Sequence, residues 1–145
     1  MTIYLASDHA GFSFKEQLHE HLLSLGYVVE DCGAFHKDPE DDYPDFVIPA
    51  SLKVLENPGS RGIVIGGSGQ GEAMAANKVK GVRAAVYYGG SLDIVRLARA
   101  HNNATVLSLG ARFVSLEEAV EAVHIFLEQP FEQGRHERRV GKLEE

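Results

Sequence analysis

The segment GIVIGGSGQGEAMAANK, residues 62–78, decides the fold, because a strand, a glycine loop and a helix follow one another within it. Gly62–Ile65 is an apolar run typical of a buried strand, and Glu72–Lys78 contains helix-forming residues. Between them, Gly66–Gly71 holds four glycines in six positions. A strand that enters a helix through such a loop indicates a β–α–β unit, in which successive strands run parallel.

The same alternation of strand and helix continues on both sides of this segment. Further β-rich runs predict strands at Thr2–Ser7, Tyr27–Glu30, Val82–Tyr87 and Val106–Leu109. Apolar residues at helical spacing predict helices at Ser13–Leu25, Pro44 to about Asn57, Leu92–Ala100 and Leu116–Leu127. Nearly all strand residues are apolar, as in a sheet covered on both faces. We therefore expect an α/β fold, a three-layer α/β/α sandwich with a Rossmann-like five-stranded parallel sheet.

Composition limits the class of protein to which the chain can belong. Its 145 residues are 44% hydrophobic, which suits a single domain over residues 1–145, with an arginine-bearing tail at 132–145. The 14 basic and 21 acidic residues give a net charge of −7, which argues against nucleic acid and anionic membranes as partners. No apolar run approaches the ~20 residues of a membrane span, and the first residues resemble a strand rather than a signal peptide. Cys32 is the single cysteine, which excludes an intrachain disulfide. We expect a cytoplasmic protein.

The predicted architecture indicates where a ligand would bind, because open parallel sheets bind ligands beyond the carboxyl ends of their strands. Three segments follow strand ends in the sequence: Asp8-His9, the glycine loop, and Gly110-Ala111-Arg112. Polar side chains in these segments are the first candidates for function.

The glycine loop has the composition of an anion site. Its backbone N–H groups can converge on an anion next to the positive end of a helix, and they belong to Gly67, Ser68, Gly69 and Gly71. The loop is not a P-loop, since Glu72 stands where the lysine belongs, and it lacks the small residue of a dinucleotide fingerprint. Glu72 beside an oxyanion site suits proton removal from carbon. The alternative is a carboxylate that only complements the helix dipole.

Two pairs of polar residues lie at the ends of predicted elements. Asp8 and His9 directly follow the first strand, where the alternative to a functional role is a helix cap and a solvated imidazole. His101 and Asn102 close a predicted helix, where a histidine also complements the negative end of the dipole and an asparagine caps the chain. For both pairs the residues alone leave the functional and the structural interpretation open.

Two arginines in the tail have the spacing of a phosphate site. Arg135 and Arg139 are four residues apart, so on a helix they project from one face. Two guanidinium groups on one face suit a phosphate group, and Arg112 at the ligand edge could join them. The alternative is a solvated helical tail in which Glu132 and Glu137 pair with the arginines.

A metal centre is not indicated by the sequence. His19 and His21 are two residues apart and point to different helix faces, and there is no H-E-x-x-H motif or Cys/His cluster. Cys32 lacks an evident activating partner, so we expect a structural role for it. The acidic run Asp38–Asp45 is typical of a solvated loop, although Tyr43 within it could face the ligand site.

Taken together, these motifs resemble one family, ribose-5-phosphate isomerase type B, in the superfamily that includes galactose-6-phosphate isomerase subunits. The resemblance covers nearly the whole chain. Its motifs, in order, are Ser7-Asp8-His9-Ala10-Gly11, Asp42-Tyr43-Pro44, Gly66 to Glu72 with Ala75-Ala76-Asn77-Lys78, His101-Asn102-Asn103, Gly110-Ala111-Arg112, and Gly134-Arg135-His136 with Arg138-Arg139.

The resemblance implies interconversion of ribose 5-phosphate and ribulose 5-phosphate through a cis-enediolate, with no metal and no cofactor, in the pentose phosphate pathway. It implies that His101, with Asp8 opposite, opens the sugar ring, and that Glu72 then moves a proton between C2 and C1. Ser68 would relay the hydroxyl proton. The enediolate oxygens would be held by the glycine loop, through Gly67, Ser68, Gly69 and Gly71.

The resemblance also implies how the substrate is bound and how the chain assembles. The phosphate-binding residues would be His9, Arg112, Arg135 and Arg139, with Tyr43 and Asn102 as further substrate-binding residues. In this family the site forms between two subunits, and the residue matching His101 comes from the neighbour. We therefore expect a homodimer or a dimer of dimers.

One position departs from many members of the family. They carry a cysteine base at the position of Gly66, and Cys32 cannot replace it. Glu72 instead matches the subgroup in which a glutamate is the base. Two alternatives stay open, an isomerase of a six-carbon sugar phosphate (allose 6-phosphate or galactose 6-phosphate) and a non-catalytic sugar-phosphate-binding module. The presence of both Glu72 and His101 disfavours the module.

Overall fold

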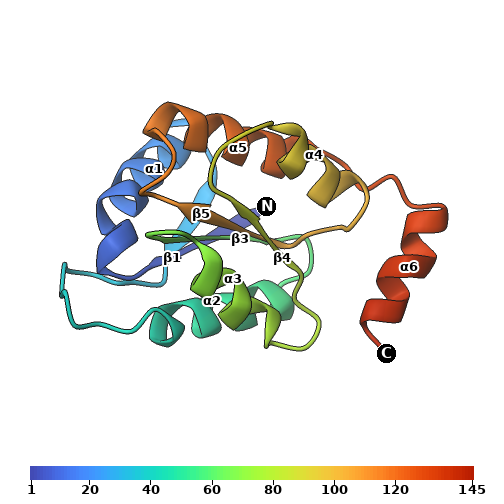
Figure 1. The fold of residues 1–145 in the computed structure, drawn as a ribbon, viewed down its shortest axis with the longest axis horizontal. Coiled ribbons are helices and arrows are strands. Elements are labelled where there is room, and N and C mark those ends of the chain that lie inside the picture. The colour runs from blue at the N-terminus through green and yellow to red at the C-terminus, as the bar shows by residue number, and fades with distance from the viewer.

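The computed structural model, which describes residues 1–145, is a parallel sheet between two layers of helices (Figure 1). The five strands stand in the order β2-β1-β3-β5-β4, and every neighbouring pair is parallel. Their bounds are β1 Thr2–Ser7, β2 Val28–Asp31, β3 Arg61–Gly66, β4 Ala84–Tyr87 and β5 Val106–Gly110. The predicted three-layer sandwich is confirmed.

The helices divide between the two faces of the sheet. α1, α4 and α5 cover one face and α2 and α3 the other (Figure 1). The helix bounds are η1 His9–Gly11 (a 3-10 turn), α1 Phe12–Ser24, α2 Pro44–Glu56, α3 Gln70–Asn77, α4 Asp93–Ala100, α5 Leu116–Glu128 and α6 Arg135–Leu143. None of them has both the length and the hydropathy that a membrane crossing requires.

Alternation along the strands builds one apolar core on each face. In β1, Ile3 and Leu5 belong to the core beneath α1, α4 and α5, whereas Tyr4 and Ala6 belong to the core above α2 and α3. Successive side chains of a strand point to opposite faces, so a strand with helices on both sides must be apolar throughout.

Two strands begin later than predicted. β2 starts at Val28 rather than Tyr27, and β4 starts at Ala84 rather than Val82. The delay in β4 has a local cause, because the Arg83 backbone N–H donates to the Thr105 hydroxyl at 3.3 Å rather than to a strand carbonyl.

The order of strands creates a topological switch point between β1 and β3. α1 leaves the carboxyl end of β1 toward one face, and α3 leaves that of β3 toward the other (Figure 1). A crevice at such a switch point is where open α/β sheets bind ligands. The segments that flank it are η1 and the loop that joins β3 to α3.

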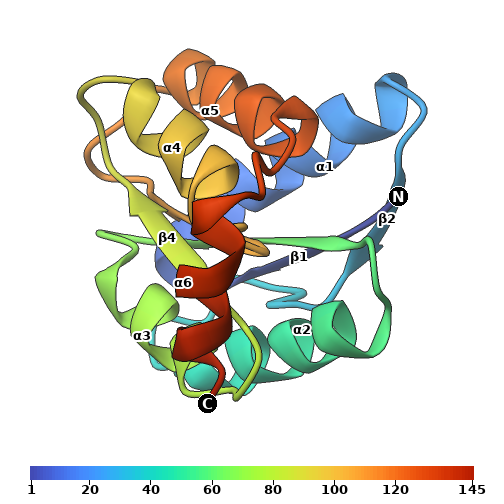
Figure 2. The ribbon, with the colours of Figure 1, turned by 90° about the vertical axis from the view of Figure 1, so that its right-hand side faces the viewer.

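α6 lies apart from the two helical layers, beyond the amino ends of the strands and close to the start of β4 (Figures 1 and 2). Figure 2 shows it crossing in front of β4. Only His136 and Val140 of its residues are buried. Its far end is tied to the sheet by an ion pair of 2.7 Å between Glu144 and Arg83, the residue before β4.

Candidate active site

The loop between β3 and α3 is held by hydrogen bonds to its carbonyl groups, which leaves several of its N–H groups free. The N–H groups of Ala111 and Arg112 donate to the carbonyls of Gly66 and Gly67 at 2.8 and 3.0 Å. The Gly69 carbonyl accepts from the buried Ser108 hydroxyl at 2.6 Å. The backbone N–H groups of Gly67, Ser68 and Gly69 donate to no acceptor within the chain. The loop therefore presents several open donors at the start of α3, which suits an anion.

Glu72 lies beside these donors in the first turn of α3 and is only 4% exposed. Its carboxylate rests against the Cα of Gly66, so that any side chain at residue 66 would overlap both carboxylate oxygens. Oε2 is buried and has no hydrogen-bond partner. Burial raises the pKa of Glu72, and the nearby Asp8 carboxylate raises it further. A buried carboxylate with an unpaired oxygen next to open N–H donors has the arrangement of a general base beside an oxyanion hole.

Asp8 and His9 follow β1, on the other side of the switch point. Oδ1 of Asp8 accepts the Ala10 N–H at 3.0 Å, so Asp8 does cap η1, the structural role that the sequence left open. Gly11 lets η1 pass directly against the Ile65 carbonyl near the end of β3. Asp8 is buried, and its charge also acts on Glu72, whose pKa it raises.

Asp41 orients His9, and the sequence did not indicate it. Oδ1 of Asp41 lies 2.7 Å from Nδ1 of His9 and also accepts the His9 backbone N–H at 3.1 Å. The hydrogen bond that Nδ1 of His9 donates to Asp41 raises the pKa of His9, which favours the imidazolium form, and it leaves Nε2 facing away from the carboxylate. Asp41 belongs to the acidic run that we interpreted as a solvated loop. The one signal for it was its closeness to Tyr43.

Tyr43 and Arg112 complete the rim of the glycine loop. A Cβ on Gly71 would lie 2.6 Å from the Tyr43 hydroxyl oxygen, and a Cβ on Gly67 would lie 3.0 Å from Cζ of Arg112. Both glycines therefore allow a functional side chain to approach the loop backbone closely. The residues brought together at this end of the sheet are Asp8, His9, Tyr43, Gly67, Ser68, Gly69, Gly71, Glu72 and Arg112.

The other predicted site residues lie at the opposite end of the sheet. His101 is the C-cap of α4, the helix that leads into β5. The carbonyl of Asn102 accepts a hydrogen bond of 3.2 Å from Nε of Arg83, the residue that precedes β4. Because the strands are parallel, this is the amino end of the sheet. α6, which carries Arg135 and Arg139, lies at the same end (Figure 2). Within one chain, therefore, Arg112 does not join these arginines, and His101 does not reach Glu72.

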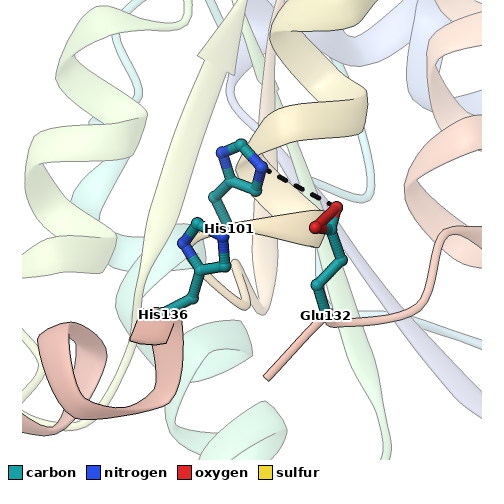
Figure 3. A group of neighbouring side chains, drawn as sticks. All are labelled: His101, Glu132 and His136. Atoms are coloured by element: carbon teal, nitrogen blue, oxygen red, sulfur yellow. Dashed lines mark ion pairs between the residues drawn. The ribbon is translucent and has the colours of Figure 1, made fainter. Parts of the chain in front are cut away.

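His101 has two neighbours that the sequence did not single out. Its ring stacks on that of His136, with the centroids 4.1 Å apart and the planes at 9°. Its Nε2 lies 3.7 Å from Oε2 of Glu132, and Figure 3 shows the carboxylate at the edge of the His101 ring. Arg135 and Arg139 are exposed and form no ion pair, with Glu132 and Glu137 or with any other acid. In the sequence, His136 stands out only as part of the motif Gly134-Arg135-His136, and no role was predicted for it.

Two clusters of side chains hold enough donor atoms to be considered as metal sites. One is Asp8, His9 and Asp41, and the other is His101, Glu132 and His136. In the first, Nδ1 of His9 is already hydrogen bonded to Asp41. In the second, the stacked rings place their nitrogen lone pairs in two nearly parallel planes, so they cannot meet at one ion unless a ring turns. Neither cluster is prearranged as a closed metal centre.

Cys32 directly follows β2, the edge strand next to β1, and not a strand at the switch point. Burial raises the pKa of its thiol to about 11. A thiol with so high a pKa is protonated at neutral pH and is a poor nucleophile, which agrees with the structural role expected from the sequence.

Comparison with known proteins gives consistent matches over the whole chain. The family model described as Ribose/Galactose Isomerase matches residues 3–143. Ribose-5-phosphate isomerase B of Mycobacterium leprae is 46% identical over 146 residues, which cover 100% of this chain and 89% of the relative. The probable ribose-5-phosphate isomerase B of Mycoplasma pneumoniae is 45% identical over 141 residues, covering 97% of this chain and 91% of the relative.

Solved structures agree with these matches. The crystal structure of ribose-5-phosphate isomerase B from Mycoplasma genitalium, with bound ribulose-5-phosphate, aligns with a TM-score of 0.94 at 45% identity, covering 99% of this chain and 93% of that one. The isomerase from Thermotoga maritima aligns with a TM-score of 0.92 at 42% identity, covering 99% and 97%. With the motifs, the fold and these matches in agreement, the chain belongs to the Ribose/Galactose Isomerase family.

Proposed function

We propose that the protein is an aldose–ketose isomerase that interconverts ribose 5-phosphate and ribulose 5-phosphate through a cis-enediolate, without a metal or cofactor. The observation that carries the proposal is the buried carboxylate of Glu72, unpaired at Oε2 and lying beside the open N–H donors of the glycine loop. Relatives at 45–46% identity have the name ribose-5-phosphate isomerase B, which supports the five-carbon substrate. Residues 1–145 would act as one catalytic domain, in the pentose phosphate pathway of the cytoplasm.

The proton transfer follows from the position of Glu72. In the open-chain aldose, Glu72 takes the proton from C2, and the negative charge moves to the carbonyl oxygen at C1. The N–H groups of Gly67, Ser68 and Gly69 hold that oxyanion as it forms. The Ser68 hydroxyl relays a proton between the two oxygens, and Glu72 returns its proton to C1, which yields the ketose. No electrons leave the substrate, so no redox cofactor is needed.

Ring opening precedes this step and requires His101. Ribose 5-phosphate is a furanose in solution, and His101 with Asp8 would move the proton from the C1 hydroxyl to the ring oxygen. Because His101 and Glu72 lie at opposite ends of the sheet in one chain, the His101 that serves a given Glu72 belongs to a second copy. We therefore propose a homodimer, or a dimer of dimers, with the site shared between subunits.

Phosphate binding would also draw on both copies. His9 and Arg112 lie beside the glycine loop of one chain, and Arg135 and Arg139 project from α6 of the other. A protonated imidazole and three guanidinium groups are opposite in charge to a phosphate dianion and supply hydrogen-bond donors to its oxygens. Asn102 and Tyr43 complete the sugar-binding residues, one from each copy.

Replacing Glu72 with glutamine tests the central assignment. The change keeps the shape of the side chain and removes the base, so turnover of ribose 5-phosphate should fall by roughly 10²–10⁴-fold. The dissociation constant of ribulose 5-phosphate, measured by calorimetry, should stay within about threefold. The exposed Glu20→Gln variant on α1 is the matched control and should turn over normally. Near-normal turnover by Glu72→Gln would sink the assignment.

A coupled assay of the wild-type protein against five- and six-carbon sugar phosphates tests the substrate. We expect kcat/KM for ribose 5-phosphate to exceed that for allose 6-phosphate and galactose 6-phosphate. The reverse order would reassign the protein to a six-carbon substrate without changing the roles of Glu72 and His101.

A further inference from the structure

The segment between α5 and α6 is fastened to the end of α4, next to His101. Nε of Arg99, a residue only 3% exposed, donates to the Gln129 carbonyl at 3.2 Å. The Glu132 N–H donates to the Ala100 carbonyl at 2.9 Å. These two hydrogen bonds attach the segment to the two residues that precede His101, so its side chains are held at a defined place relative to that ring.

A tight reversal then directs α6 back over His101. Gln133 and Gly134 both have left-handed backbones, with φ values of 64° and 58°. A non-glycine residue in this region is uncommon and persists where its surroundings require the conformation. The reversal starts α6 at Arg135 and places His136 directly on the face of His101 (Figure 3).

The side chain of His136 is buried, yet its ring forms no hydrogen bond within the chain. The residue is 7% exposed, and Nε2 is buried without a partner. A buried polar atom without a partner is unfavourable by about 1–3 kcal/mol. We therefore expect the buried His136 ring to have a role that compensates for this energy. Desolvation, together with His101 and Arg135, lowers the pKa of His136 and keeps this ring neutral near pH 7. What the ring does contact is the face of His101.

We propose that His136 is a positioning residue for His101, with Glu132 at the edge of the ring, and that the two hold the His101 imidazole in the orientation needed for ring opening. The stack restrains the plane of the His101 ring, and the carboxylate 3.7 Å from Nε2 favours the χ2 orientation that turns this nitrogen toward Glu132 rather than its flipped alternative. The inference rests on the proposed isomerase function and adds residues to it.

The same geometry connects ring opening with phosphate binding. His136 lies on α6 between Arg135 and Arg139, so one short helix carries both the proposed phosphate ligands and the ring that positions His101. A phosphate group bound by these arginines would hold α6, and with it the stack, in place. Misplacing a reacting group by about 1 Å costs on the order of 10²-fold in rate, so support for His101 has a kinetic consequence.

Ring opening can be measured separately from proton transfer at carbon. Opening moves a proton from the C1 hydroxyl to the ring oxygen while the bond between C1 and the ring oxygen breaks, and the products are an aldehyde and a C4 hydroxyl. Ribulose 5-phosphate cannot close a furanose ring, because its C5 oxygen is esterified. Removal of a C1 proton from ribulose 5-phosphate therefore needs Glu72 but not His101. Uptake of deuterium at C1 in D2O, followed by proton NMR, reports that step alone.

The experiment compares His136→Ala, His136→Phe and Glu132→Gln with His19→Ala, a histidine control on α1. For His136→Ala we expect kcat with ribose 5-phosphate to fall about tenfold, while KM and the rate of deuterium uptake by ribulose 5-phosphate stay within about twofold. His136→Phe keeps a flat ring and should recover kcat to within about threefold. Glu132→Gln should lower kcat selectively as well, and His19→Ala should change neither rate.

Any of three results in the kinetics of turnover and exchange would overturn the positioning role, and a fourth result, in KM, would do so as well. The three are an unchanged kcat in His136→Ala, an equal loss of turnover and deuterium uptake, and a His136→Phe variant as slow as His136→Ala. A rise in KM alone would assign His136 to phosphate binding and likewise overturn it. Failure of the isomerase function itself looks different, because the wild-type protein would then neither turn over ribose 5-phosphate nor exchange the C1 proton of ribulose 5-phosphate.

Discussion

The carboxylate of Glu72 lies where a side chain at residue 66 would project, and this contact links two features that the sequence presents separately. Gly66 is needed because any Cβ there would overlap both carboxylate oxygens. Glu72 in turn is buried by the backbone of the strand end that Gly66 occupies. The glycine and the glutamate therefore form one structural unit, in which the absence of a side chain at residue 66 makes room for the Glu72 carboxylate.

The Gly66→Ala variant tests this unit. The new methyl group must displace the Glu72 carboxylate, and a displacement of about 1 Å should lower kcat on the order of 100-fold. Circular dichroism should show a folded protein. Gly141→Ala is the control, because a Cβ there meets no atom within 4 Å. Turnover near the wild-type value in Gly66→Ala would mean that the carboxylate need not rest against residue 66.

If Glu72 is the base, as proposed, its pKa sets the acidic limit of activity, because a base must be deprotonated. Burial and the Asp8 charge raise the pKa of Glu72 above that of an ordinary glutamate. Activity should therefore be lost as pH falls through a value above that of an ordinary glutamate. Deuterium uptake by ribulose 5-phosphate, measured against pH, should show this limb. In Asp8→Asn the limb should move to lower pH, whereas the limb of the substrate phosphate stays in place. If the acidic limb of the pH profile does not move in Asp8→Asn, the assignment of this limb to Glu72 is contradicted.

At the scale of elements, the sequence predicts helices and strands where hydrophobic periodicity is strong. It predicts site residues where they directly follow a strand. Asp8, the glycine loop and Arg112 all follow strand ends, and the structure places them together. Asp41 was missed because its role depends on a long loop folding back to His9, which no local pattern encodes. The stack of His136 on His101 was missed for a similar reason, since it arises from a reversal at residues 133–134.

Arg135 on α6 can be tested for its proposed contact with the substrate phosphate. Replacing Arg135 with alanine should raise KM for ribose 5-phosphate on the order of tenfold and leave KM for unphosphorylated ribose nearly unchanged, because one charge-assisted contact to phosphate is lost. Arg138→Ala, a neighbour on the same helix outside the i,i+4 pair, is the control. Equal effects on both sugars would remove Arg135 from the phosphate site.

At the scale of the whole molecule, the residues proposed for the site fall into two groups at opposite ends of one sheet. The strand order β2-β1-β3-β5-β4 places the first group at the carboxyl ends of β1 and β3, and α4 and α6 place the second group at the amino ends. Periodicity does not predict strand order. The separation, however, follows from a simple rule, since a helix that leads into a parallel strand ends at the amino edge of the sheet, and His101 ends such a helix.

Mixing two inactive variants tests whether the two groups join between copies. Glu72→Gln and His101→Ala should each be nearly inactive alone. If they are unfolded and refolded together, about half of the dimers contain both variants, and each mixed dimer holds one intact site with Glu72 from one chain and His101 from the other. The mixture should therefore recover about one quarter of wild-type activity. No recovery, with mixed dimers shown by mass spectrometry, would place His101 and Glu72 of one chain in the same site.

The contact between Gly66 and Glu72 also couples the substitutions that these two positions can accept. A cysteine at residue 66 and the Glu72 carboxylate would occupy the same volume, because a Cβ at residue 66 already overlaps both carboxylate oxygens. A side chain at residue 66 therefore requires a smaller or displaced side chain at residue 72. We expect the two positions to vary together, as a pair, rather than one at a time.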